Sequence, residues 1–251
     1  MNLVSKNNSI VDCARYAFRP NELAYCGPDK NKELLQYIES GLPSEALVKD
    51  GGLKDILSKF ETLSPYLRLI ANSNKENNIF SKEIIQSYWI GSDKLLNINK
   101  ARFYEHLAEG LMLKKKLSKE ELSIVKDKVH EGANPHHSFH VFNIWRRTGY
   151  VENPHTLFTM DECRIGWGVV IEMGNNILKV LYKPLVFQKG RLAFGDVVEK
   201  QILYNLPGEV KVGDWVSFHW SSYCEVLTED KIYNLKKWTI ININLANKSY
   251  K

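Results

Sequence analysis

Three histidines lie close together in the segment His136-His-Ser-Phe-His140. If this segment is helical, His136 and His140 are i, i+4 neighbours, and His137 and His140 are i, i+3 neighbours. Imidazoles at such spacings can bind one metal ion. At a helix start the dipole disfavours an imidazolium cation, which leaves a neutral ring that can act as a ligand or a base. The competing interpretation is a polar helix start with one histidine packed inside.

The four cysteines are far apart and form no Cys-x-x-Cys pair: Cys13, Cys26, Cys163 and Cys224. The first residues show no apolar stretch of a secretory signal, so we expect a cytoplasmic protein with thiols rather than disulfides. A thiol can be a metal ligand, but it can equally be a small buried hydrophobe. Cys26 is the best candidate to join the histidines, because Pro20, Gly27 and Pro28 predict a turn-rich segment around it that could fold back.

Patterns with helical spacing dominate the first part of the chain. They predict helices over residues 32–40, 53–60, 64–70, 81–90 and 101–113. Gly91 is expected to stop the fourth of these, and the segment Ser118-Lys-Glu-Glu121 is a capping box that opens another helix. A further helix is predicted from about residue 135 to 147 with Asn134 as its cap, although the alternation in that segment also permits a strand.

The composition changes near residues 150–159, where Gly149 and Pro154 predict a linker. Strand-like runs follow at residues 164–172, 177–182 and 215–219, with a Gly-Asn-Asn turn after the first. Short strands within about 65 residues favour a small closed β-barrel. Thr228 then opens a closing helix. We therefore expect an α+β protein with an α-helical domain at residues 1–155 and, at residues 160–251, a small barrel with a C-terminal helix.

Two motifs in the predicted barrel resemble the HypC-type [NiFe]-hydrogenase maturation chaperones. One begins at Cys163 (CRIGWGVVIEMGNNILKV), and the other is Val212-Gly-Asp-Trp-Val-Ser-Phe-His219. The resemblance covers about residues 160–245 and implies an OB-like barrel. It also implies that Cys163 supplies a thiolate and His219 an imidazole to an iron centre during assembly of the hydrogenase cofactor. In that family the cysteine is essentially N-terminal, whereas Cys163 is internal.

A second resemblance extends over nearly the whole chain. The segments ARYAF at residues 14–18, NELAYCGP at 21–28, YWIG at 88–91 and HHSFHVF at 136–142 are similar to a family of uncharacterised bacterial proteins. The similarity continues through CRIGWG at residues 163–168 and GDWVSFHW at 213–220. It implies one architecture and no known activity.

These residues lead to a first hypothesis, a metal-binding accessory or maturation protein. It would carry a transition metal, with iron favoured, for a hydrogenase maturation partner or another client protein. The alternative is a metalloenzyme whose His136, His137, His140 and Cys26 form a site in the helical domain, with the barrel as a docking module. Such an enzyme needs a carboxylate for proton transfer, and Glu22 and Glu131 are near in sequence.

A third hypothesis is a nucleic-acid or protein-binding module that uses the barrel aromatics Trp167, Trp215, Trp220 and Tyr223. The charge argues against nucleic acid, because 34 basic and 29 acidic side chains leave a net charge of only +5. The densest basic cluster, Lys114-Lys-Lys116, is more typical of a solvated helix end than of a nucleic-acid site. No apolar run approaches the 18 or so residues of a transmembrane helix, so we expect no membrane partner.

Overall fold

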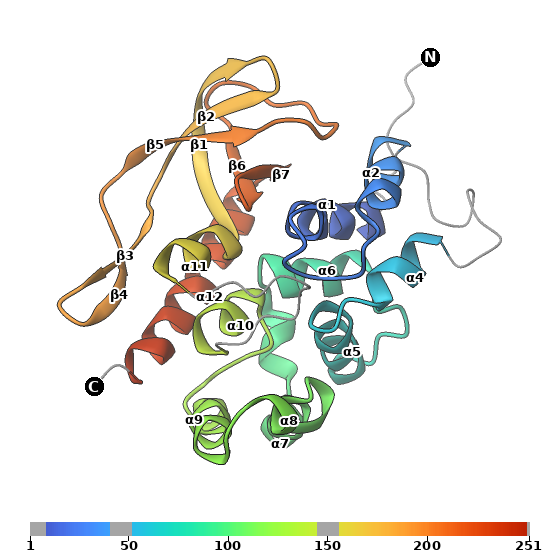
Figure 1. Ribbon diagram of the computed structural model, residues 1–251, viewed down its shortest axis with the longest axis vertical. Coiled ribbons are helices and arrows are strands. Elements are labelled where there is room, and N and C mark those ends of the chain that lie inside the picture. The colour runs from blue at the N-terminus through green and yellow to red at the C-terminus, as the bar shows by residue number, and fades with distance from the viewer. Residues whose placement is uncertain (1–8, 41–51, 145–155, 250–251) are drawn as a thin grey trace.

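The computed structural model describes residues 9–40, 52–144 and 156–249, and it combines a helical part with a β-sheet part (Figure 1). The described helical part consists of α1 (Ser9–Glu22), α2 (Asn31–Ser40), α4 (Gly52–Ser58), α5 (Leu63–Ser73), α6 (Lys82–Trp89), η1 (Asp93–Asn97), α7 (Lys100–Glu105), the π-helical η2 (His106–Gly110), α8 (Leu113–Lys116), α9 (Lys119–His130) and α10 (His137–Asn143). The sheet part begins after α11 (Leu157–Cys163) and ends with α12 (Glu229–Asn247). The α+β class is confirmed.

Local sequence signals account for most of these helices. The predicted helices over residues 32–40, 53–60, 64–70 and 81–90 correspond to α2, α4, α5 and α6. Both halves of the predicted capping box form at α9, where Ser118 and Glu121 each accept a backbone N–H from the other. Gly91 follows α6 with a φ of +96°, and its N–H closes on the Gln86 carbonyl over 2.8 Å.

Two helical predictions are wrong in part. The segment over residues 15–28 is not turn-rich throughout, because α1 runs through Pro20 to Glu22 before the turns begin. Pro20 stands in the last turn, where it removes one hydrogen bond of the helix, the one to the Tyr16 carbonyl. The helix expected over residues 101–113 breaks after Glu105 into the π turn. There the His106 ring lies over Gly110, where an added Cβ would be 2.5 Å from the ring's Nδ1.

The predicted helix from about residue 135 to 147 is confirmed over α10, and the strand alternative is wrong for those residues. The cap is His136 rather than Asn134, because the His136 ring accepts the N–H of Ser138 over 3.2 Å. Residues 145–147 of this prediction, and the linker residues Gly149 and Pro154, lie outside the described residues. The helix α11, which ends at Cys163, was not predicted.

Five strands form a sheet that closes on itself in the order β1-β2-β5-β7-β6, with β6 paired back to β1. These strands and the separate β3-β4 hairpin are β1 (Gly166–Gly174), β2 (Ile177–Tyr182), β3 (Leu185–Gln188), β4 (Arg191–Phe194), β5 (Val198–Leu203), β6 (Trp215–His219) and β7 (Ser222–Val226). The runs predicted for β1, β2 and β6 are confirmed, and the irregular stretch between β2 and β6 holds three further strands that were not predicted.

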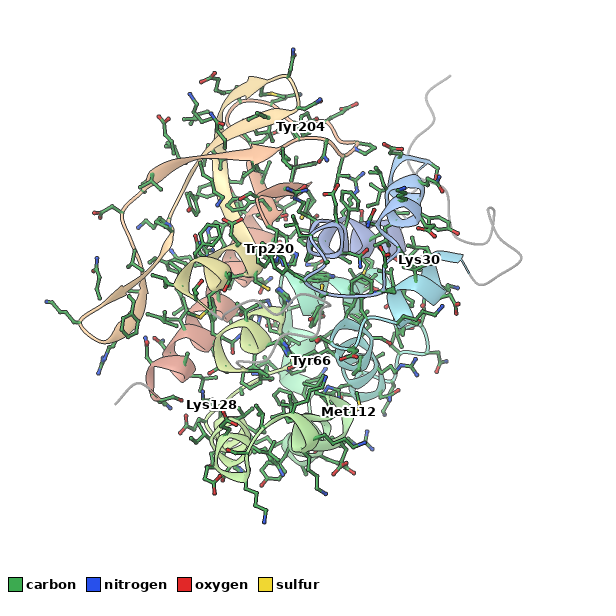
Figure 2. All side chains as sticks on the ribbon, in the orientation of Figure 1. Lys30, Tyr66, Met112, Lys128, Tyr204 and Trp220 are labelled. Carbon is green, nitrogen blue, oxygen red and sulfur yellow. The ribbon has the colours of Figure 1, made fainter. Side chains whose placement is uncertain are left out.

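The hydrophobic core of the helices extends into part of the sheet region, whereas the interior of the closed sheet forms a separate cluster. Besides side chains from α1 through α10, this core contains Ile165, Cys224 from β7, and Leu235 and Trp238 from α12. Trp220, next to the sheet, and Tyr66, on α5, both lie toward the middle of the molecule in Figure 2, and both are buried. Whether residues 1–155 and 160–251 are separate domains stays a prediction.

No helix in the described ranges has the length and apolarity that crossing a membrane requires.

Candidate metal centre

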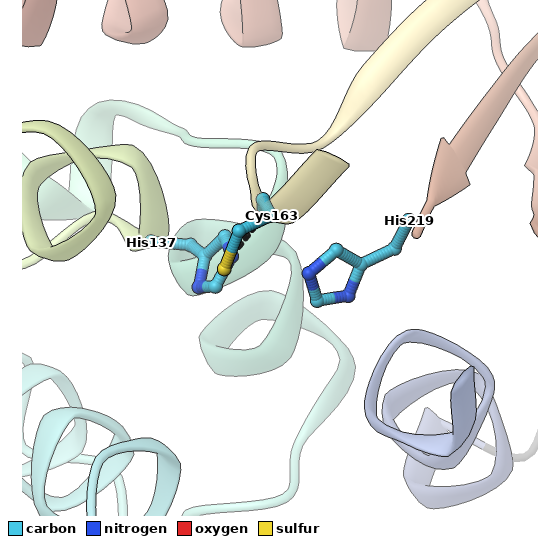
Figure 3. A group of neighbouring side chains, drawn as sticks. All are labelled: His137, Cys163 and His219. Carbon is cyan, nitrogen blue, oxygen red and sulfur yellow. Dashed lines mark hydrogen bonds between the residues drawn. The ribbon is translucent and has the colours of Figure 1, made fainter. Parts of the chain in front are cut away.

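His137, Cys163 and His219 converge where α10, α11 and β6 meet (Figure 3). One ligand atom from each side chain, an imidazole nitrogen or the sulfur, lies within 4.8 Å of the other two. His137 is the first residue of α10, Cys163 the last residue of α11 and His219 the last residue of β6. Three segments that are remote in sequence therefore place a thiol and two imidazoles around one point.

The end of α11 that carries Cys163 is held by its neighbour Arg164. The Arg164 side chain is buried, and it donates to Asp161 Oδ1 over 2.8 Å and to the Lys183 carbonyl over 2.7 Å. Asp161 Oδ1 also accepts the N–H of Leu185 over 2.9 Å. A buried guanidinium that is paired and hydrogen-bonded in this way resists displacement, so the turn from α11 into β1 is firmly placed.

Backbone carbonyls orient the two histidine rings. The Nδ1 of His219 lies 2.6 Å from the carbonyl oxygen of Tyr16, and the Nε2 of His137 lies 2.7 Å from that of Cys163. A carbonyl only accepts, so each of these nitrogens carries the proton, and His219 Nε2 and His137 Nδ1 carry the lone pairs. Metal-binding histidines commonly donate their other N–H in this way.

Tyr88 and Trp89 of α6 support the two rings from one side. The Tyr88 hydroxyl lies 3.2 Å from His137 Nδ1 and donates to its lone pair, so a metal ion bound there would replace this hydrogen bond. The Trp89 ring centroid lies 4.7 Å from that of His137 and 5.7 Å from that of His219. The sequence signal for these residues was the YWIG motif, which could be recognised but not assigned a role.

The electrostatics of the site favour a neutral imidazole at His137. Burial, together with the nearby His219 ring, holds the pKa of His137 well below its ordinary value. A metal ion needs the unprotonated nitrogen, so proton release does not oppose binding at His137 near neutral pH. The helix dipole argued from sequence acts in the same direction, but burial is the larger cause.

A cavity of about 70 Å³ adjoins the three side chains. Cys26 and His140 line it together with His137, Cys163 and His219, so five of the six residues expected as ligands share this cavity. Cys26 and His140 are outside the group whose ligand atoms lie within 4.8 Å of one another, and they are candidates for a further ligand.

His136 does not join this group. It precedes α10 in an extended backbone conformation, so the i, i+4 pairing with His140 does not form. Its ring is buried, with Nδ1 2.7 Å from Ser138 Oγ, and it stacks toward Trp238 at a centroid distance of 6.5 Å. Burial lowers the pKa of His136 to about 3. Its role here is that of a helix cap.

The carboxylates and aromatics considered from sequence lie elsewhere. Glu22 pairs with Arg19, Glu131 lies 3.1 Å from Lys248, and neither of these carboxylates lines the cavity. Of the four barrel aromatics, Trp220 and Tyr223 are buried, Trp167 is half-buried, and Trp215 is exposed at 39%. Four aromatics that differ so much in exposure do not form one open platform for stacking bases.

The chain belongs to DUF6390, a family of unknown function, and the match covers residues 6–251. This agrees with the predicted membership of an uncharacterised family. No curated protein and no solved structure matches the chain.

Proposed function

We propose that this protein binds a transition metal ion through His137, Cys163 and His219 and acts as an accessory or maturation protein that carries the metal. The observation that supports this most directly is the convergence of one thiol and two imidazoles within 4.8 Å. On this proposal, the two sets of ligands considered from sequence contribute to a single site.

The donor set narrows the choice of metal. A thiolate with imidazoles suits iron, zinc or copper and disfavours magnesium and calcium, which prefer oxygen ligands. We favour iron, because the resemblance to the HypC-type chaperones pairs Cys163 with His219 as ligands of an iron centre. On this proposal the client is a hydrogenase maturation partner or a related metalloprotein.

The second candidate function is that of a metalloenzyme. Three protein ligands leave one coordination position open, as in catalytic zinc sites, and the adjoining cavity could admit a small substrate. Cys26 or His140 would occupy that position in a carrier and leave it vacant in an enzyme. Glu61 is the carboxylate among the described residues that line the cavity, and it lies 2.9 Å from Lys116.

Anaerobic purification followed by elemental analysis tests the proposal. We expect iron, below one equivalent, in the wild-type protein and little in Cys163→Ala, while Cys13→Ala is the matched control because Cys13 is buried on α1 and belongs neither to this group of ligands nor to the cavity lining. Iron in Cys163→Ala at the wild-type level would exclude this site. Infrared absorption of iron-bound cyanide or carbon monoxide would favour hydrogenase maturation, whereas another metal that supports turnover would favour the enzyme.

A further inference from the structure

The two residues that follow His219 have an unusual backbone conformation. Trp220 and Ser221 connect β6 to β7 as a two-residue hairpin, in which His219 pairs with Ser222. Their φ angles are +51° and +53°, the combination found in a type I′ turn. Asn and Gly are the usual residues in such turns, because positive φ is unfavourable for a residue with a bulky side chain. Something in the surrounding structure must therefore stabilise this turn.

Glu162 contacts both residues of the turn. Its carbonyl oxygen accepts the N–H of Trp220 over 2.9 Å, and its Oε2 accepts the hydroxyl of Ser221 over 2.6 Å. Its Oε1 forms an ion pair with Lys200 of β5. Only 8% of Glu162 is exposed, so these hydrogen bonds form in surroundings where a carboxylate interacts strongly with its partners.

These contacts connect the two metal-ligand segments. Glu162 immediately precedes Cys163, and Trp220 immediately follows His219. The hydrogen bonds of Glu162 thus tie the end of α11 to the end of β6 within two residues of each ligand, while the Cys163 carbonyl holds the ring of His137.

We propose that Glu162 is a positioning residue that sets the geometry between the Cys163 sulfur and the His219 imidazole by clamping the strained Trp220-Ser221 turn. This inference rests on the proposed metal site. The clamp has a second consequence at the cavity, where Trp220 stacks on Tyr25 at a centroid distance of 4.0 Å and both rings line the wall. The turn thereby places part of the cavity wall together with His219.

The variant Ser221→Gly distinguishes an effect on the placement of the metal ligands from an effect on the stability of the protein. Glycine adopts positive φ without strain, so this change favours the folded backbone while it removes the hydroxyl that donates to Glu162. We expect an unfolding temperature close to that of the wild-type protein, because the relieved backbone strain offsets the lost hydrogen bond, together with about 10-fold weaker Co²⁺ binding and a weakened thiolate-to-cobalt charge-transfer band.

Three further variants complete the experiment. Lys189→Gly relieves a φ of +52° in the turn between β3 and β4, and it should leave Co²⁺ binding and the spectrum unchanged. Ser221→Asn should restore most of the affinity, because asparagine tolerates positive φ and its amide can donate to Glu162. Glu162→Gln, which removes the charge, should weaken Co²⁺ binding by about 10–100-fold.

Failure of the positioning role of Glu162 and failure of the proposed metal-binding function would give different results. A Ser221→Gly protein with wild-type affinity and spectrum would overturn the role of Glu162 and leave the metal site standing. Parallel losses of stability and affinity in Ser221→Gly would mean that the contact is merely structural, and would also overturn it. A wild-type protein that fails to bind Co²⁺ would overturn the proposed function and this inference with it.

Discussion

The ring of His137 donates a hydrogen bond to the main-chain carbonyl of Cys163, with the two atoms 2.7 Å apart. One candidate ligand is therefore oriented by the backbone, and not by the side chain, of another. Substitution of the Cys163 side chain leaves this bond in place, so the thiol can be removed without releasing the imidazole.

Metal binding should stabilise the fold. An ion that binds only the folded state raises the free energy of unfolding, by about 2.7 kcal/mol at a concentration 100 times the dissociation constant. We expect Co²⁺ or Zn²⁺ to raise the urea midpoint of the wild-type protein, and a chelator to reverse the shift. Cys163→Ala should show no such shift. An equal shift in that variant would place the metal elsewhere.

Substitutions at the adjacent residues His136 and His137 should have very different effects on metal binding. Asparagine is a preferred N-cap residue, so His136→Asn keeps the cap of α10 and should leave the metal content unchanged. His137→Asn removes a ligand and should reduce metal affinity at least 10-fold, as measured by competition with a chromophoric chelator. Equal losses in the two variants would contradict the assignment of His136 as a cap.

Cys26 is the candidate fourth ligand whose removal is easiest to interpret. If it completes the site, Cys26→Ala should lower Co²⁺ affinity about 10-fold and reduce the number of thiolate-to-cobalt transitions. Cys13→Ala is the control, because Cys13 is fully buried on α1 and does not line the cavity. An unchanged cobalt spectrum in Cys26→Ala would leave the fourth position to His140 or to an external ligand.

Lys128 should make stability rise at alkaline pH. Burial lowers the pKa of Lys128 from 10.5 to about 8, with Glu131 partly opposing this. Between those values the unfolded chain binds more protons than the folded protein, so the free energy of unfolding increases with pH, and the penalty is complete below about pH 8. Lys128→Met should therefore stabilise the protein by about 1–3 kcal/mol at pH 7, and by less above pH 10.

Urea unfolding at pH 7 and pH 10 measures this difference. Lys119→Met provides the control, because Lys119 is on the same helix but is exposed. A Lys128→Met protein that is less stable than wild type at pH 7 would show that the ammonium group contributes more than its burial costs.

Gly91 should tolerate no side chain. Its φ is +96°, and an added Cβ would lie 2.0 Å from Cδ1 of Trp238 on α12. Gly91→Ala should destabilise the protein by about 3 kcal/mol or more, because it combines backbone strain with displacement of a buried indole. Gly132→Ala separates the two effects, since Gly132 has a φ of +102° and no atom within 4 Å of an added Cβ. Gly132→Ala should cost about 1 kcal/mol of stability. Equal losses of stability in the two variants would exclude a packing role for Gly91.

Features that depend on a few consecutive residues could be predicted from the sequence. The capping box at Ser118, the helix stop at Gly91 and the strand that ends at His219 all formed as expected. Each is specified by periodicity or by a cap, which are local properties. The turn after His219 could not be predicted, because Trp220 and Ser221 are not the Asn or Gly typical of a type I′ turn, and their conformation coincides with contacts to Glu162, which is remote in sequence.

By itself, then, the sequence identified the types of side chain that could bind a metal and the helices and strands that carry many of them. Only the tertiary structure decided which of these side chains meet: His137 joins Cys163 and His219, whereas its neighbour His136 turns away to cap the helix. The physical reason is that this meeting depends on how α10, α11 and β6, which are remote in sequence, pack against one another in the folded chain. Local periodicity carries no information about such packing.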